Sequence, residues 1–397
     1  MPLASLSAGC SRASSGGSVT VSGFAQTSSV LGAGLSAIPL AQLAQRRGRA
    51  FALTTGYLVA VVGAGVILLS PRLGIYALFG GLALFGVATA SGLQARFAAS
   101  EAVAPQFGAR AMSIVLWATT VGSVAGPNLS QLGSDIGALL GMEPLSGPFM
   151  FSCVAFALSA ILLSVFLGGR LPAPEAGNGG EAASSAHGNR VSMGTALRAA
   201  VRNRGAVIGL LAVASSHTVM VAVMVMTPVH MSLAGHGLDA VGIVISVHIL
   251  GMYAASPIFG WLTDRLGEVP VILIGVAIFA GAVGLGIAAA ALGDDMLLVM
   301  IALGLLGLGW SAGIIGGSAL LTKSTVPEHR LQLQGASDSL MNFAAAAASA
   351  GSGVLLEIGG FELLNAAAGA LLLPLLVVSI RWLLRVRSQG GPRSARA

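Results

Sequence analysis

The chain has 397 residues, of which 55% are apolar and only 9% are charged, and its formal net charge is +6. A soluble globular domain carries about 25% charged residues, so a chain that folds mainly against water is excluded. The basic residues are dispersed among the ends of apolar segments, which excludes a concentrated patch for nucleic acid. The two cysteines, Cys10 and Cys153, have neither metal-site nor redox spacing.

Apolar runs of about 20 residues, long enough to cross a hydrocarbon core as helices, recur along the chain. A backbone in lipid must satisfy its own hydrogen bonds, so repeated runs of this length predict helices rather than strands. We therefore predict an all-α membrane protein with about eleven transmembrane helices. Their expected positions are residues 19–43, 51–70, 74–95, 111–132, 148–168, 205–229, 240–262, 270–291, 296–320, 335–355 and 362–384.

A polar segment splits these predicted helices into two bundles. Residues 169–203 mix Pro, Gly, Asn, Ser, Glu and Arg, which is typical of a linker. The first residues lack the basic start and apolar core of a signal peptide. The expected organisation is a non-membrane segment at 1–17, an N-terminal bundle at 18–168, the cytoplasmic linker at 169–203, a C-terminal bundle at 204–386 and a cytoplasmic tail at 387–397.

Basic residues indicate the orientation, because cytoplasmic loops are enriched in Lys and Arg. With the linker inside, every basic residue except Arg12 and Arg72 falls on the cytoplasmic side. We therefore expect a multi-pass protein of the plasma membrane with a cytoplasmic C-terminus. The expected partners are the lipid bilayer and a small solute or a metal ion, and we expect a monomer without a cofactor.

One loop pattern occurs in both halves of the chain. Residues 41–50 read AQLAQRRGRA and residues 260–269 read GWLTDRLGEV. Both place Leu, a polar residue, Arg and Gly in the same order, at Leu43, Gln45, Arg46 and Gly48 and at Leu262, Asp264, Arg265 and Gly267. Internal repeats of this kind are characteristic of secondary transporters.

The repeated pattern resembles the G-x-L-a-D-R-x-G-R loop of the major facilitator superfamily, which joins the second and third helices and again the eighth and ninth. The resemblance covers nearly the whole chain and implies a two-bundle fold that transports by alternating access. It also implies cytoplasmic gating roles for Gln45, Arg46, Gly48 and Arg49 and for Gly260, Asp264, Arg265 and Gly267. In the family the Asp pairs with Arg and with a helix end. Because Gln45 replaces the Asp of the first copy, we expect that gate to be weaker.

The N-terminal half is shorter than the resemblance requires. Two predicted spans, 205–229 and 240–262, lie in the region that leads to Gly260, whereas only one, 19–43, lies in the region that leads to Ala41. We therefore expect the first family helix to be missing, through a truncated or misassigned start.

Residues 122–127, GSVAGP, resemble the G-x-x-x-G-P of the fifth helix in efflux members of the family. Gly122, Gly126 and Pro127 would allow close helix contact and a kink. Plain helix packing and a mechanistic role both fit this motif.

Methionine and histidine recur at helical spacing in the first two spans after the linker. Met220 and Met224 are spaced i, i+4, as are His248 and Met252, so each pair shares one helix face. Counted from the turn near His236, Met224 and His248 are equally distant, as are Met220 and Met252. An antiparallel hairpin would bring the four side chains to one level near the bilayer centre, where secondary transporters place substrate sites.

Thioethers together with an imidazole favour a soft cargo ion, with Cu(I) as the leading candidate. The M-x-x-x-M and H-x-x-x-M pair resembles the motifs of the CcoA-like copper importers, a branch of the same superfamily. The resemblance implies that Met220, Met224, His248 and Met252 carry copper during uptake. The same branch includes riboflavin carriers, and methionine also fills gaps between membrane helices, so the cargo stays open. His217 is a further candidate for lining the cavity.

Two further residues lie at the ends of predicted helices. Asp338 opens the eleventh family helix, where it would either take up a coupling proton or cap the helix end. Arg96 closes the fourth family helix, where an interfacial position, a pair with Glu101 and a gating role are the alternatives. Trp310 is assigned to packing or interface anchoring.

The sequence contains no P-loop, no H-E-x-x-H and no G-x-S-x-G, so it predicts a transporter rather than an enzyme. The leading hypothesis is secondary transport by alternating access, with copper as cargo. The alternatives are proton-coupled efflux of organic compounds and riboflavin-type vitamin transport. An inactive or sensor-like truncated membrane protein is the alternative from another class.

Overall fold

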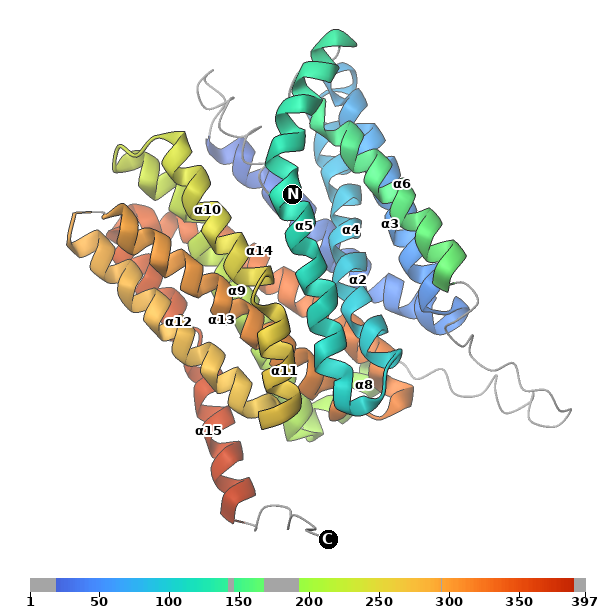
Figure 1. The fold of residues 1–397 in the computed structure, drawn as a ribbon, viewed down its shortest axis with the longest axis vertical. Helices are drawn as coiled ribbons and strands as arrows, with labels where there is room; N and C mark the ends of the chain where they lie inside the picture. Colours follow the sequence, from blue (N-terminus) through green and yellow to red (C-terminus); the bar gives the residue numbers. More distant parts are fainter. Residues whose placement is uncertain (1–18, 142–145, 168–192, 294, 389–397) are drawn as a thin grey trace, which may run out of the picture. The chain divides into compact units, whose positions relative to one another are not determined.

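The computed structural model describes residues 19–141, 146–167, 193–293 and 295–388 (Figure 1). Within these ranges all regular elements are helices, which confirms the predicted all-α class. Nine helical segments of the described chain are long and apolar enough to cross a membrane, and Pro327–Arg385 covers the last two predicted spans. The helices are α2 (Val19–Arg47), α3 (Arg49–Leu73), α4 (Ile75–Glu101), the 3-10 helix η1 (Pro105–Phe107), α5 (Gly108–Leu139), α6 (Pro148–Leu167), α8 (Met193–Arg202), α9 (Arg204–Leu233), α10 (Leu238–Tyr253), α11 (Ser256–Leu266), α12 (Glu268–Ala291), α13 (Met296–Lys323), α14 (Pro327–Ala370) and α15 (Leu373–Ser388).

Two of the predicted spans are divided near a proline. The span 240–262 consists of α10 and α11, with Pro257 in the first turn of α11. The span 362–384 begins in α14 and continues in α15, whose second residue is Pro374. Proline lacks an N–H and its ring clashes with the carbonyl group four residues earlier, so each helix is interrupted just before the proline.

Two other local features differ from simple straight spans. α14 bends at Gly359 and Gly360, and Gly360 has a φ of 67°, a left-handed conformation that glycine adopts without steric cost. This bend falls in the gap between the spans predicted at 335–355 and 362–384. The predicted linker contains the helix α8, which simple polarity did not indicate.

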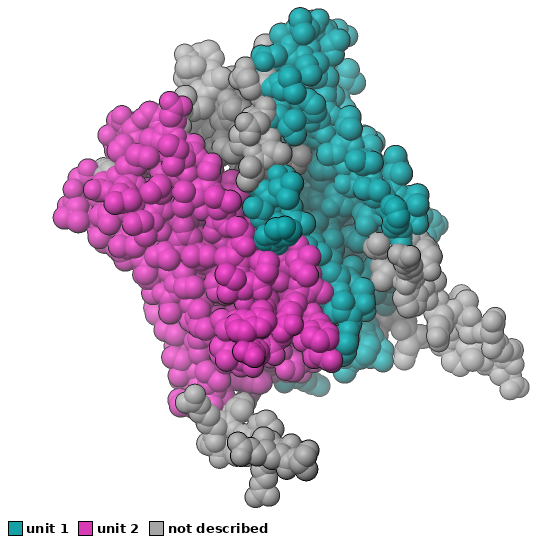
Figure 2. All heavy atoms as spheres, in the orientation of Figure 1, with its two compact units in different colours: residues 1–105, 115–202, 325–350 teal, residues 106–114, 203–324, 351–397 magenta. Residues whose placement is uncertain are grey.

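The described helices belong to two compact units (Figure 2). Unit 1 comprises residues 1–105, 115–202 and 325–350, and unit 2 comprises residues 106–114, 203–324 and 351–397. In unit 1, α3 packs on α4 and α6, and α2 packs on α4. In unit 2, α13 packs against α9, α10 and α12 and so lies at the centre of that group. Segment 325–350 therefore packs with elements of the first half of the chain.

Glycines allow the close approach of helices around α13. A Cβ on Gly317 would lie 2.9 Å from the Cβ of Ala212 in α9. A Cβ on Gly307 would lie 2.8 Å from the backbone nitrogen of Met252 in α10. Small residues at such positions let membrane helices approach closely and pack by van der Waals contact. This packing holds the helices together, because the hydrophobic effect does not drive helix association inside lipid.

Candidate functional site

The repeated loop forms the same backbone turn in both halves of the chain. Gly48 has a φ of 87° and a ψ of 159°, and Gly267 has a φ of 91° and a ψ of 167°. Each glycine separates two consecutive helices, α2 from α3 and α11 from α12. Because a side chain rarely tolerates a positive φ, the backbone itself requires the glycine of both copies.

In the second copy, Asp264 joins α11 to the first turn of α5 within unit 2. Its carboxylate accepts hydrogen bonds from the backbone nitrogens of Ala109 and Arg110, each 3.2 Å long, and lies 3.3 Å from the Arg110 side chain. The unpaired N–H groups and the dipole at a helix N-terminus stabilise a carboxylate there. Gly260 permits this approach, because a Cβ there would lie 2.9 Å from a backbone carbonyl oxygen of α5. Arg265 stacks on a neighbouring tryptophan ring.

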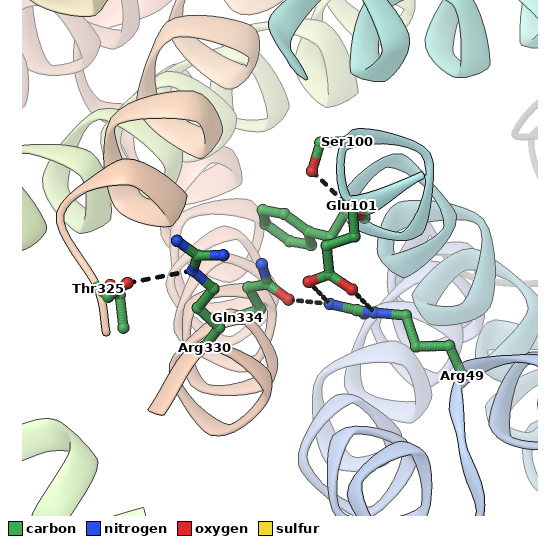
Figure 3. Close-up of polar contacts among 7 residues, drawn as sticks. Arg49, Ser100, Glu101, Thr325, Arg330 and Gln334 are labelled. Carbon is green, nitrogen blue, oxygen red and sulfur yellow. Dashed lines mark hydrogen bonds and ion pairs between the residues drawn. The ribbon is translucent and has the colours of Figure 1, made fainter. Parts of the chain in front are cut away.

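In the first copy, Arg49 makes the polar contacts instead of the residue at the Asp position. Its buried guanidinium pairs with the Glu101 carboxylate, with 2.6 Å between Nε and Oε2, and also donates to the side-chain oxygen of Gln334 (Figure 3). Gln45 is half-buried and Arg46 is exposed. Arg49 therefore joins α3, α4 and the part of α14 that belongs to unit 1.

A fully buried ion pair joins α4 to α14 in the same unit. Arg96 Nη2 lies 2.7 Å from Asp338 Oδ1, and both side chains are 0% exposed. Asn342 donates a hydrogen bond of 2.7 Å to the backbone carbonyl of Asp338. Asp338 Oδ2 has no hydrogen-bond partner in the described part of the chain. Since α14 begins at Pro327, the alternative in which Asp338 caps the helix end is wrong. Arg96 is buried in its pair with Asp338.

The predicted methionine and histidine residues lie on α9 and α10. Met220 is 3% exposed, His248 0% and Met252 6%, and Met224 is half-buried. His248 Nδ1 lies 2.8 Å from the carbonyl oxygen of Leu303 in α13, so Nδ1 donates and Nε2 holds the lone pair of the neutral ring. Among the described residues, Nε2 has no hydrogen-bond partner although it is buried.

Both α9 and α10 pack against α13. Their contacts with α13 therefore show which residues of α9 and α10 lie at the same height along that helix. On α10, His248 contacts Leu303 and Met252 lies against Gly307. These two contacts advance in the same direction along both helices, so α10 and α13 run parallel.

On α9 the contacts run in the opposite direction. His217 contacts Trp310, whereas Ala212, earlier in α9, lies against Gly317, later in α13. Continuing this register by one to two turns brings the α9 methionines to the levels of Met252 and His248.

A hydrogen-bonded aromatic cluster lies at the middle of α13. Trp310 Nε1 donates to His217 Nδ1 at 3.0 Å, and the Tyr253 ring packs edge-on against Trp310 with 5.5 Å between ring centroids. Since α13 runs from 296 to 323 and α9 from 204 to 233, this hydrogen bond lies close to mid-span of both helices. Trp310 is buried, and His217 and Tyr253 are half-buried. Sequence reasoning gave Trp310 a packing role and did not single out Tyr253.

The predicted efflux-type motif lies inside α5, which contains Gly122, Gly126 and Pro127. A Cβ on Gly122 would meet no atom within 4 Å. The side chains at 124–128 lie outside those described, so the kink assigned to this motif stays a prediction.

Comparison with known proteins decides the family. The sequence matches the Major Facilitator Superfamily over residues 4–240 and again over 211–397. The chain belongs to the Major Facilitator Superfamily.

Relatives of this facilitator support the same assignment over nearly its full length. It is 35% identical over 371 residues to the uncharacterized MFS-type transporter YddS of Bacillus subtilis (strain 168), covering 93% of this chain and 84% of YddS. It is 30% identical over 373 residues to the riboflavin transporter RfnT of Brucella anthropi, covering 92% of this chain and 86% of RfnT. Its fold is similar to that of the E. coli fucose:proton symporter FucP, with a TM-score of 0.60, 16% identity and coverage of 91% and 90% of the two chains.

Family membership confirms the coarser predictions from sequence. This facilitator is a multi-pass membrane transporter that carries a small solute by secondary transport, and it is not an enzyme. The two-bundle fold class is confirmed by the family match and the structural likeness.

If Arg96 and Asp338 form a buried ion pair, removing one charge should destabilise the protein more than removing both. Asp338→Asn leaves a buried guanidinium without its counter-ion and should lower stability by about 3–5 kcal/mol. Arg96→Gln in addition should restore most of the loss, because no net charge then remains buried. Thermal unfolding in detergent measures this, with Lys323→Gln as the control, since the exposed pair of Lys323 with Glu268 should contribute at most about 1 kcal/mol. An additive double variant would contradict the pairing.

Proposed function

We propose that this facilitator carries a flat organic ring compound of the vitamin type, with riboflavin as the first compound to test. The observation that carries the proposal is the hydrogen bond between His217 and Trp310 at mid-span of α9 and α13. Secondary transporters place substrate sites near the bilayer midplane. An ionisable residue buried at that depth is costly in lipid, so it marks a functional site by default.

The chemistry of this cluster suits an uncharged aromatic cargo. Trp310 donates to His217 Nδ1, which assigns the remaining ring proton to Nε2 and keeps the imidazole neutral. Trp310 and Tyr253 add ring surfaces from α13 and α10. Small-molecule sites typically combine aromatic walls with a few fixed polar groups, which matches this composition.

The relatives add support from outside the geometry. RfnT is named a riboflavin transporter, and its match extends over 92% of this chain. The branch of copper importers that the Met and His motifs resemble also includes riboflavin carriers, which agrees with this choice of cargo.

Copper uptake is the second candidate, favoured by the buried lone pair of His248 Nε2. A metal-binding histidine usually donates its other ring N–H to a carbonyl or carboxylate, and His248 donates Nδ1–H to Leu303. Met252 lies one turn away on the same face, and the register along α13 puts Met220 and Met224 at matching levels. No group of three or more His, Cys, Asp or Glu residues in the described chain could hold a metal, so a metal cargo would rest on thioethers.

For either cargo, we propose that Asp338 takes up the coupling proton. Protonation would remove the negative charge that holds Arg96 and would loosen α14 from α4. The contacts of Asp264 with α5 and of Arg49 with Gln334 would break and re-form during alternating access. We place the transporter in the plasma membrane as a monomer with a cytoplasmic C-terminus.

Radiolabelled riboflavin uptake in cells that lack their own transporter tests the first proposal. His217→Ala and Trp310→Phe should each lower the initial rate by about ten-fold, since the first removes the imidazole and the second removes the N–H that positions the imidazole and part of the ring surface. Trp382→Phe, on α15, should leave the rate unchanged. Wild-type uptake no higher than that of empty cells would rule out riboflavin, and equal rates in all variants would rule out the cluster as its site.

Uptake of radioactive copper in the presence of ascorbate, which keeps it as Cu(I), tests the second candidate. The double variant Met220→Ala with His248→Ala removes a thioether from one helix and an imidazole from the other, and it should lower copper uptake at least ten-fold. Met226→Ala, a change to a methionine on another face of α9, should preserve it. Copper uptake that survives the double variant contradicts this candidate.

A further inference from the structure

The short helix α8 has an exposed apolar ridge next to a buried one. Ala196 and Ala200, spaced i, i+4, are buried, at 1% and 3% exposure. Leu197 and Val201 follow one position later and are 38% and 72% exposed. A helix of ten residues thus packs two alanines against the protein and leaves its larger apolar side chains uncovered.

The next ridge around α8 is basic. Arg198 and Arg202 follow Leu197 and Val201 by one position and are exposed. Successive residues are about 100° apart around a helix, so the basic ridge adjoins the apolar ridge on the side away from the alanines. No ion pair with a carboxylate is found for either arginine within the described residues.

Chain connectivity places α8 at the edge of the bilayer. α8 ends at Arg202, and the spanning helix α9 begins at Arg204. Asn203 between them caps α9, because its side-chain oxygen accepts from the backbone nitrogens of Gly205 and Ala206. Two peptide units reach less than about 8 Å, so the end of α8 stays at the level where a spanning helix starts.

We propose that α8 is an interfacial helix that binds anionic lipid headgroups of the surrounding bilayer. The Leu197 and Val201 ridge enters the boundary of the acyl chains, and Arg198 and Arg202 bind the acidic headgroups above it. Adjacent apolar and basic ridges are the composition of helices that lie in the membrane interface. Guanidinium groups bind phosphate oxygens through paired, charge-assisted hydrogen bonds. This inference does not depend on the cargo.

A depth and headgroup measurement on the full chain tests the proposal. In a Cys10→Ser, Cys153→Ser background, Val201→Cys carries an environment-sensitive fluorophore, and the protein is placed in vesicles of phosphatidylcholine with phosphatidylglycerol. Brominated phosphatidylglycerol should quench the label more than the same fraction of brominated phosphatidylcholine. Each basic residue near an anionic surface favours acidic lipid by about five-fold, so Arg198→Gln with Arg202→Gln should abolish the preference.

Two controls make the outcome decisive. A label at Ala199→Cys, on the exposed side away from the apolar ridge, should respond to aqueous iodide and little to brominated lipid. Arg198→Lys with Arg202→Lys should keep the preference for the acidic lipid. The proposal is overturned if the label at 201 is shielded from lipid and iodide alike, which indicates a protein partner. It is also overturned if the preference persists without the two positive charges.

Discussion

A polar group inside a bilayer must find its hydrogen-bond partner within the protein, because the surrounding hydrocarbon offers none. In this facilitator the partners lie on neighbouring helices, so satisfying the polar groups also joins the helices. Arg96 pairs with Asp338 between α4 and α14. Trp310 donates to His217 between α13 and α9, and His248 donates to a carbonyl of α13 from α10. These contacts, together with close approach at glycines, position the side chains on which transport would depend.

Some buried polar atoms lack a hydrogen-bond partner within the described residues, and His248 Nε2 and Asp338 Oδ2 are two of them. A buried polar atom left unpaired costs about 1–3 kcal/mol. The first atom has a lone pair suited to a soft metal ion, and the second can accept a proton. In the mid-span aromatic cluster, by contrast, Trp310 Nε1 donates to His217 Nδ1, and the Tyr253 ring packs edge-on against the buried Trp310 ring.

The sequence predicted the features that depend on local composition. Apolar runs located the spans, and the repeated motif located the turns at Gly48 and Gly267. It did not predict the partner of Arg96, because Asp338 lies far away in the chain and only tertiary packing brings the two charges together. A basic and an acidic residue at the ends of apolar spans were the available signal, since charges buried in a membrane protein usually pair with one another. Pro257 was a further local signal, because proline interrupts a helix and so indicates that the span 240–262 is divided there.

The candidate site shows the same division between local and tertiary information. Helical periodicity put Met220 and Met224 on one helix and His248 and Met252 on another, and their role as ligands stays a prediction. It could not show that α13 packs against both α9 and α10. The pairing of His217 with Trp310 likewise depends on α13.

The most direct measurement of the central claim is equilibrium binding of riboflavin to the purified full chain in detergent. We expect saturable binding that His217→Ala weakens about ten-fold and that His236→Ala, in the turn after α9, leaves intact. Binding that is absent in the wild type, or equal in both variants, would contradict it.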